Sequence, residues 1–314
     1  MNERKRARTW PVRTTRHPGH TAAPSDTSGT AHIQKPTTRD HAAGIPAPHP
    51  EPRRDLRPNR PASARLASLM LAGKDHLPAD RILLHQLQAE DAGCAETVRR
   101  AREFLHHTVR LQAERGLGQF LDLGCGLTTG APGTVLAPIH TSILTVRPGA
   151  RVTYLDRDPV VMTHARALLD APKPARIRHL HADLTSPRTL LAMLRLSADL
   201  DWRRPVVAVL GDVLHELSDP QARSLLRALH TELPADSVLV LTHRTADATA
   251  PVRAVRVAAC WARAGLPWHP RAPAAVDALL GGWERQELGV QPATGAGTPS
   301  LYAVVAVRGG GSTR

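Results

Sequence analysis

Apolar and amphipathic runs alternate along the central part of the chain, and this alternation predicts the fold. Four runs have the alternating or continuous apolar character of buried strands: residues 120–123, 151–156, 177–182 and 205–210. The run 160–169, which follows the second of these, carries apolar residues at helical spacing. Strands interleaved with helices are typical of a mostly parallel sheet with helices packed on it, so we predict an α/β fold.

An aspartate stands at or just beyond the end of each predicted strand. The four residues are Asp122, Asp156, Asp183 and Asp212. In an open parallel sheet the carboxyl ends of the strands line the binding crevice, so these acids are expected to converge. A strand-terminal aspartate on its own is commonly a helix cap or a turn former. Four of them in consecutive βα units favour a ligand site.

The turn after the first predicted strand combines two glycines with a negative charge. Gly124 and Gly126 let the backbone turn tightly and bring bare peptide groups against a nucleotide-like ligand. Asp122 favours a cationic or amine-bearing ligand over a pyrophosphate, which it would repel. The same seven residues, 120–126, are also compatible with a purely structural turn. Cys125 is expected to be a small filler rather than a nucleophile.

Further helices and strands are expected on both sides of this central part. Three helices precede it, at residues 64–71, 81–89 and 97–113. After it we expect a fifth strand at 238–243, a helix at 252–264 and two antiparallel strands at 283–290 and 301–307. The N-terminal helices are expected to cap the ligand edge of the sheet.

Two groups of residues have both a structural and a functional interpretation. The turn Gly73-Lys-Asp-His76 is either a helix C-cap followed by an N-cap, or part of a lid with Lys74, Asp75 and Asp80 facing the site. Three tryptophans, Trp261, Trp268 and Trp283, could form a set that stacks on nucleic-acid bases. We expect a core or pocket-wall position for them instead.

The N-terminal 56 residues differ from the rest in composition. They are rich in Pro, Thr, His and Arg and contain few apolar residues, so we predict a disordered basic tail. The net charge of the 314-residue chain is +13, and residues 1–60 hold 12 Lys and Arg against 5 Asp and Glu. Such an arm can bind nucleic acid, although charged tails are commonly only solvated.

The cysteines and the apolar runs bear on the compartment. The three cysteines (94, 125 and 260) are too widely spaced for a metal site or a disulfide framework, which favours a reducing, cytoplasmic environment. The first twenty residues are basic and nearly free of acids, as in a transit peptide. They lack the apolar core of a secretory signal, and no apolar run is long enough to span a bilayer.

With these residues in place, the chain resembles the class I S-adenosylmethionine-dependent methyltransferases. The resemblance implies a seven-stranded, mostly parallel Rossmann-like sheet whose last strand is antiparallel. It also implies that the glycine loop holds the methionine part of S-adenosyl-L-methionine. The acid after the second strand would hold the ribose hydroxyls, and the acid after the third would meet the adenine. The cofactor residues implied in this way are Asp122, Gly124, Cys125, Gly126, Asp156, Arg157, Asp183, Leu184, Gly211 and Asp212.

A narrower resemblance is to one bacterial family of S-adenosyl methyltransferases, long catalogued as a domain of unknown function. It covers about residues 57–308, and the combination of Gly73-Lys-Asp75 with Asp156-Arg-Asp-Pro-Val-Val161 is specific to it. The other shared residues are 60–65, 76–81, 126–129, 164–168, 182–184 and His140. This likeness implies the cofactor but not the methyl acceptor.

The chain departs from the broader class at the glycine loop. Thr128 stands where a third glycine would be, which the narrower family shares. An insertion at about residues 130–138 falls where the first helix should begin, and Pro132 and Pro138 are expected to break or delay that helix. A helix N-terminus would supply backbone donors to the cofactor carboxylate, so cofactor affinity is the inherited property that the insertion puts in question.

These observations favour methyl transfer to an unidentified small-molecule acceptor. His215, after the fourth strand, is the candidate base, although it could equally cap or pack against the adenine. The expected organisation is a tail (1–56), a methyltransferase domain (57–308) and a disordered C-terminus (309–314). Within the domain we expect a helical cap (57–115) and a Rossmann-like core (116–308).

Three alternatives stay open. The chain could bind the cofactor without transferring a methyl group, or associate with nucleic acid through the basic arm. A nicotinamide dehydrogenase is a third possibility on fold alone, and Asp122 in the glycine loop argues against it. No Asn-Pro-Pro-Tyr-like motif follows the fourth strand, as DNA base-amino methyltransferases would show.

Overall fold

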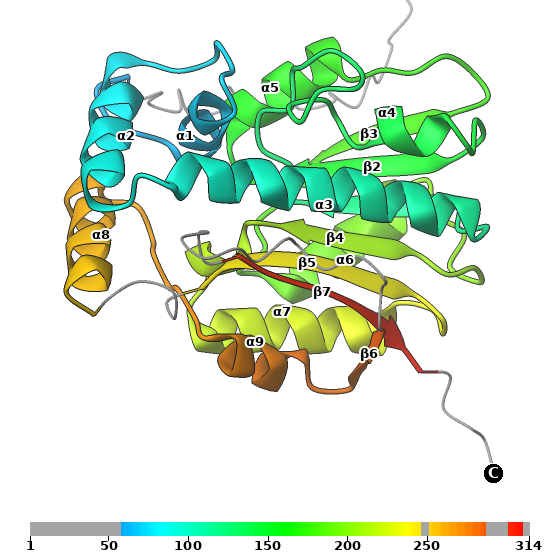
Figure 1. Cartoon of the computed structure of the whole chain (residues 1–314). Coiled ribbons are helices and arrows are strands. Elements are labelled where there is room, and N and C mark those ends of the chain that lie inside the picture. The colour runs from blue at the N-terminus through cyan, green and yellow to red at the C-terminus, as the bar shows by residue number, and fades with distance from the viewer. Residues whose placement is uncertain (1–57, 246–250, 287–300, 310–314) are drawn as a thin grey trace, which may run out of the picture. The chain divides into compact units, whose positions relative to one another are not determined.

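The computed structural model describes residues 58–245, 251–286 and 301–309, which build a seven-stranded sheet with helices on both faces (Figure 1). The strands follow the order β3-β2-β1-β4-β5-β7-β6. Strand β7 is antiparallel to both of its neighbours, and the strands from β3 to β5 are parallel. The predicted fold class is confirmed. The strands are β1 (Gln119–Leu123), β2 (Arg151–Asp156), β3 (Arg176–His181), β4 (Val207–Gly211), β5 (Val238–Arg244), β6 (Trp283–Gln286) and β7 (Leu301–Arg308).

Alternating side chains of the central strands divide the core into two layers. Phe120 of β1 packs on one face with α3 (Cys94–Glu114), α4 (His140–Leu144) and α5 (Pro159–Leu168). Leu121 packs on the opposite face with α6 (Pro187–Ser197), α7 (Asp219–Glu232) and α9 (Pro273–Leu280). Because both faces are covered, β1 is buried along its whole length, as its near-continuous apolar sequence requires.

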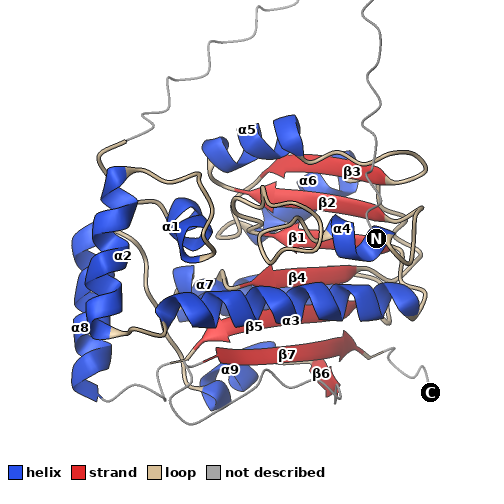
Figure 2. Ribbon diagram, turned by 45° about the horizontal axis from the view of Figure 1, so that its top comes forward, coloured by secondary structure: helices blue, strands red, loops and turns tan. Residues whose placement is uncertain are grey.

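A separate group of helices stands at the carboxyl edge of the parallel strands (Figure 2). It consists of α1 (Ser63–Met70), α2 (Pro78–Glu90) and α8 (Pro251–Ala264), together with the start of α3. Leu66, Leu83, Val98 and Trp261 belong to the apolar cluster that joins these elements. The N-terminal helices therefore cap the edge of the sheet, and α8 joins them from the far end of the sequence.

Buried charge joins the first two helices of this cap. The Asp80 carboxylate is fully buried and accepts hydrogen bonds from the backbone N–H groups of Ala62 (3.0 Å) and Leu77 (2.7 Å). It also pairs with Nε of Arg65 at 2.8 Å. The interpretation of Asp80 as a lid residue facing the site is therefore wrong, because its oxygens are committed to holding α1 and α2 together.

The other two residues of the supposed lid do not line the pocket at this edge of the sheet. Asp75 accepts a hydrogen bond from Oγ1 of Thr129 at 2.7 Å, which ties the Gly73–Asp75 turn to the loop after β1. Lys74 is exposed. A Cβ atom on Gly73 would lie 2.2 Å from Oγ of Ser68, so this glycine permits a close approach of the turn to α1.

The insertion after β1 has the effect that its prolines predict. The chain between β1 and α4 forms turns and irregular backbone, and α4 begins only at His140 and spans five residues. Arg102 of α3 holds this segment by donating from Nε to the carbonyl oxygen of Val135 (3.2 Å) and from Nη2 to that of Ala137 (2.8 Å).

Several elements differ from the predictions or lie beyond the described residues. Helices α6, α7 and α9 were not predicted, although each has a proline in its first turn as a start signal. The predicted strand at 283–290 is described only to Gln286. The tail (1–56) and residues 310–314 lie outside the described residues.

Candidate active site

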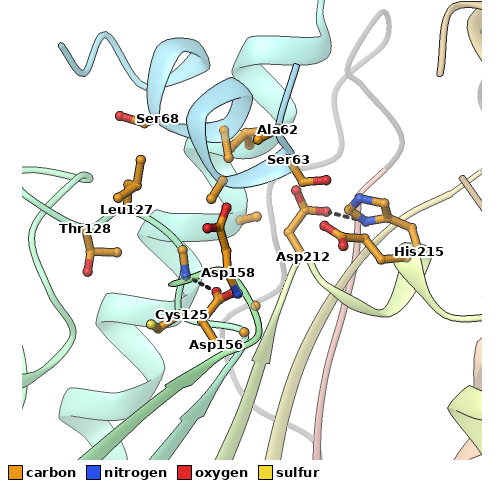
Figure 3. A pocket seen from close by; sticks show the side chains of 18 of the residues that line it. Ala62, Ser63, Ser68, Cys125, Leu127, Thr128, Asp156, Asp158, Asp212 and His215 are labelled. Carbon is orange, nitrogen blue, oxygen red and sulfur yellow. Dashed lines mark hydrogen bonds and ion pairs between the residues drawn. The ribbon is translucent and has the colours of Figure 1, made fainter. Parts of the chain in front are cut away.

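A pocket of about 250 Å³ opens at the carboxyl edge of the sheet, where the strand order reverses between β1 and β4. Its floor contains Gly124 from the loop after β1 and Gly211 from the end of β4. Residues of α1, α3 and α8 form its other walls, among them Ser63, Leu105 and Trp261. Figure 3 shows side chains of α1 and of the loops after β1, β2 and β4 around one space.

The two glycines of the loop have different roles. Both have positive φ, +80° at Gly124 and +62° at Gly126, which disfavours any residue with a side chain. A Cβ atom on Gly124 would lie 2.7 Å from Cγ2 of Val213, so this glycine permits close packing between the two loops. A Cβ atom on Gly126 would meet nothing within 4 Å. Gly126 therefore leaves bare backbone beside open space in the pocket wall.

Asp156, at the end of β2, carries a preoriented carboxylate in the pocket wall. One oxygen accepts from the N–H of Gly126 (3.0 Å) and the other from the N–H of Asp158 (2.8 Å) (Figure 3). Burial raises the pKa of Asp156 to about 6, although these two backbone donors act in the opposite direction. The loop thus holds a carboxylate with limited solvation that has accepting capacity left for hydroxyl groups.

Asp122 lies close to this carboxylate but is not one of the residues that line the pocket. It is 2% exposed, and its Oδ2 atom has no hydrogen-bond partner. Burial raises the pKa of Asp122 to about 6, with the Arg102 guanidinium lowering it and the Asp156 carboxylate raising it further. The predicted site residue is therefore a negative charge near the pocket rather than part of its surface.

On the other side of the pocket, Asp212 is locked between two basic side chains. The guanidinium of Arg244 donates to both of its oxygens at 2.6 to 3.1 Å, and Nδ1 of His215 lies 3.4 Å from Oδ1. Burial would raise the pKa of Asp212, but the Arg244 guanidinium and the His215 ring beside it hold that pKa far below its ordinary value. Asp212 also has a φ of +52°, a conformation that this pairing holds in place.

The turn that carries His215 is fixed by a buried arginine. Arg271 donates to the carbonyl oxygens of Leu214 (2.9 Å) and Leu217 (2.5 Å), which flank the short 3₁₀ turn of His215. The carbonyl oxygen of His215 itself accepts from the N–H of His269 at 2.7 Å. His215 is therefore held with Nδ1 toward Asp212 (Figure 3), which leaves Nε2 as the ring atom able to take a proton.

The residues predicted to contact adenine lie around a second, smaller cavity. This cavity, of about 30 Å³, is lined by Asp183 and Leu184 and shares Gly124, Asp156 and Arg157 with the larger pocket. Nη2 of Arg157 and Oε2 of Glu216 form an ion pair of 2.8 Å between the ends of β2 and β4. Because both residues line both cavities, this ion pair lies at the junction between them.

The described residues support neither a cysteine nucleophile nor a metal site. Cys125 is buried, and burial raises the pKa of its thiol well above the ordinary value, so it is not an activated nucleophile. Among the residues that the structure describes, no three His, Cys, Asp or Glu side chains form a group able to hold a metal ion. Of the helices within the described ranges, none has the length and apolarity needed to cross a membrane.

Several pocket residues were not predicted. Arg244 stands at the end of β5. Its position there is the same signal that pointed to the strand-terminal acids, so a basic residue at a strand end could have been recognised in the same way. Arg102 and Ser63 lie on helices before the sheet, and nothing in their local sequence distinguishes them from neighbouring residues. Trp261 and Trp268 were expected in a core or a pocket wall, and Trp261 lines this pocket. Trp283 lies in the core.

Over most of its length the chain is similar to known proteins. Residues 49–296 match the sequence profile of a protein family described as S-adenosyl methyltransferase. A DUF574 family protein from Streptomyces avermitilis is 28% identical in sequence, with a TM-score of 0.71 over 79% of this chain and 98% of that chain. A protein from Thermobifida fusca is also 28% identical, with a TM-score of 0.68 over 80% of this chain and 96% of that chain. Among curated proteins no sequence matches.

Proposed function

Since the chain belongs to the S-adenosyl methyltransferase family, we propose that it methylates a small molecule at an oxygen or nitrogen atom that gives up a proton. The family and the fold make it an S-adenosylmethionine-dependent methyltransferase. They do not identify the methyl acceptor, so its chemical class is inferred from the geometry of the site. The observation that carries the proposal is the Asp212–His215 pair in the wall of the pocket.

The described residues fit the cofactor. Ser68 and Thr128 line the pocket, and their buried hydroxyl oxygens have no partner within the described part of the chain. Gly126 leaves bare backbone beside them, and Asp156 offers accepting oxygens for ribose hydroxyls. Asp183 and Leu184 would meet the adenine. The insertion at 130–138 does not line the pocket, whereas Arg102, which anchors it, does.

The cofactor supplies a methyl group that is already activated by its positive sulfur, so the protein mainly has to position the acceptor and remove its proton. Asp212 faces Nδ1 of His215 and stabilises the ring when it becomes charged. Nε2 then takes the proton that the acceptor oxygen or nitrogen loses. Arg271 and His269 hold the His215 ring in place, because they donate hydrogen bonds to the carbonyl oxygens of the turn that carries it.

Calorimetric titration with S-adenosylmethionine and S-adenosylhomocysteine tests the cofactor half of the proposal. Asp156→Asn keeps the shape of the side chain but removes its charge, and it should abolish measurable binding. Asp170→Asn, at an exposed position outside the site, should bind like the wild type. Unchanged binding in Asp156→Asn would show that the cofactor lies elsewhere.

The acceptor half is tested by S-adenosylhomocysteine formation with a panel of phenols, alcohols and amines, and by identifying the methylated atom. Loss of a general base typically costs about 100-fold or more in rate, so His215→Gln should slow turnover by that order. Its affinity for S-adenosylhomocysteine should be unchanged. Equal turnover in His215→Gln, or a methyl group on an atom that had no proton to lose, would contradict the assignment.

A further inference from the structure

A third cavity adjoins the proposed methyl-transfer site. It has a volume of about 50 Å³ and lies between α2, α3, α8 and the end of β5. It shares Arg244 and Trp261 with the larger pocket, so these two side chains separate the two spaces. Figures 1 and 2 show α2 and α8 side by side at this edge of the sheet.

Aromatic rings connect the cavity to His215. Trp261 and Trp268 both line it, and their indoles stack with 4.6 Å between centroids and 5° between planes. The His215 ring lies 5.0 Å from the Trp268 ring and 5.9 Å from that of Trp261. A group seated in the cavity would therefore contact the same indoles as the proposed base.

The charge in this cavity is unsuited to an anion. Its only lining cation among the described residues, Arg244, is already engaged by both oxygens of Asp212. Burial raises the pKa of the Cys94 thiol to about 11, so that side chain is neutral. The Asp91 carboxylate accepts a hydrogen bond from the backbone N–H of Gly93 at 3.0 Å and forms no ion pair within the described part of the chain. Leu87 and Val257 complete an apolar wall.

We propose that this cavity receives the apolar edge of an uncharged aromatic acceptor, whose reacting O–H or N–H faces His215 in the larger pocket. The inference rests on the proposed function and assigns a substrate class to the same site. The cavity is smaller than the roughly 150 Å³ of an engineered apolar cavity that holds benzene, so only part of a ring enters it. The ring then extends past Trp261 and Arg244 toward the base, along the cavity wall that the stacked indoles of Trp261 and Trp268 contribute.

The probe is 2-naphthol, with its saturated analogue decahydro-2-naphthol and the anion 2-naphthoate as comparisons. Binding is measured by calorimetry with the protein saturated by S-adenosylhomocysteine. Naphthol should bind about ten-fold or more tightly than either comparison compound, because only it is both flat and uncharged. Equal binding of the saturated compound or of the anion would overturn the assignment.

Two variants locate the binding to the cavity. Ala254→Leu fills the cavity without removing any packing, and Trp268→Leu removes an indole while keeping an apolar side chain. Each should weaken naphthol binding by about ten-fold or more and leave S-adenosylhomocysteine affinity within about two-fold. Val255→Leu, one residue along α8 and 70% exposed, is the matched control and should bind naphthol like the wild type.

The outcomes separate this inference from the proposed function. Unaltered naphthol affinity in Ala254→Leu, with the variant folded by its melting curve, would overturn the cavity as the acceptor site. Normal binding of S-adenosylhomocysteine without any binding of naphthol to the wild type would do the same. Failure of the wild type to bind S-adenosylhomocysteine would instead overturn the cofactor half of the proposed function.

Discussion

Replacing Asp122 by asparagine should stabilise the cofactor-free protein at neutral pH. The carboxyl group is 2% exposed, its Oδ2 atom has no hydrogen-bond partner, and burial raises its pKa to about 6. A carboxyl whose pKa is raised in the folded state binds protons more tightly when folded than when unfolded. The folded state therefore loses stability as the pH rises above 3.8, the ordinary pKa of an aspartate. The loss is complete once the pH exceeds the raised pKa of about 6 and Asp122 is charged in the folded state as well.

The size of the effect follows from the two pKa values. The difference between 3.8 and about 6 corresponds to about 3 kcal/mol at pH 8, where the carboxylate is charged in both states. At pH 5 the folded state is still mostly protonated, and the cost is about half as large. The isosteric amide carries no charge at either pH, so Asp122→Asn should be more stable than the wild type by about these amounts.

Urea unfolding of the cofactor-free wild type and variant at pH 5 and pH 8 measures the prediction, with Asp170→Asn as the control. Asp170 is exposed, so its substitution should leave the difference near zero at both pH values. The reasoning would be refuted if Asp122→Asn were less stable than the wild type at pH 8. A stability gain that is the same at pH 5 and pH 8 would refute it as well, because the cost arises from ionisation.

Four further predictions concern the cap, the glycine loop and the ribose site. Asp80→Asn should lower the free energy of unfolding by roughly 3–5 kcal/mol in urea, because it leaves the buried Arg65 guanidinium without a counter-charge. Gly126→Ala should lower the free energy of unfolding by only about 1–2 kcal/mol, because a side chain disfavours the left-handed backbone at this position. It should also weaken S-adenosylhomocysteine binding, because the added methyl group enters the open space beside the loop. Gly124→Ala should be the more destabilising of the two by the same unfolding assay, since its Cβ atom would lie 2.7 Å from a valine methyl group. Calorimetry should show affinity for S-adenosylhomocysteine falling as the pH drops through about 6, where Asp156 is protonated and loses accepting capacity.

The strands and the acids after them could be predicted because their signals are local. Each strand is a short run in which apolar residues are continuous or alternate with polar ones, and Asp156 or Asp183 follows within one or two positions. Parallel pairing then brings the strand ends to one edge without further information. The helix α4 begins late for an equally local reason, since Pro138 lies just before it.

The remaining parts depend on contacts between residues far apart in the sequence. Asp80 looks like a lid residue in the sequence, but its partner Arg65 is fifteen positions away on another helix. The ion pair between Asp212 and Arg244 joins the ends of β4 and β5, thirty-two positions apart. Trp261 reaches the site only because α8 packs on α2, an arrangement that no local pattern indicates.

The acids at the strand ends occupy equivalent positions, yet their neighbours give them different charges. Arg244 pairs with Asp212, so that carboxylate faces His215 at short range but adds less negative potential to the rest of the pocket than an unpaired carboxylate would. No cation within hydrogen-bonding distance pairs with Asp122 or Asp156 in the described part of the chain, and burial raises the pKa of both to about 6. At neutral pH both are charged at a cost to the cofactor-free fold. A cofactor with a positive sulfur and an amino group offsets that charge, so the carboxylates that destabilise the empty site favour its occupation.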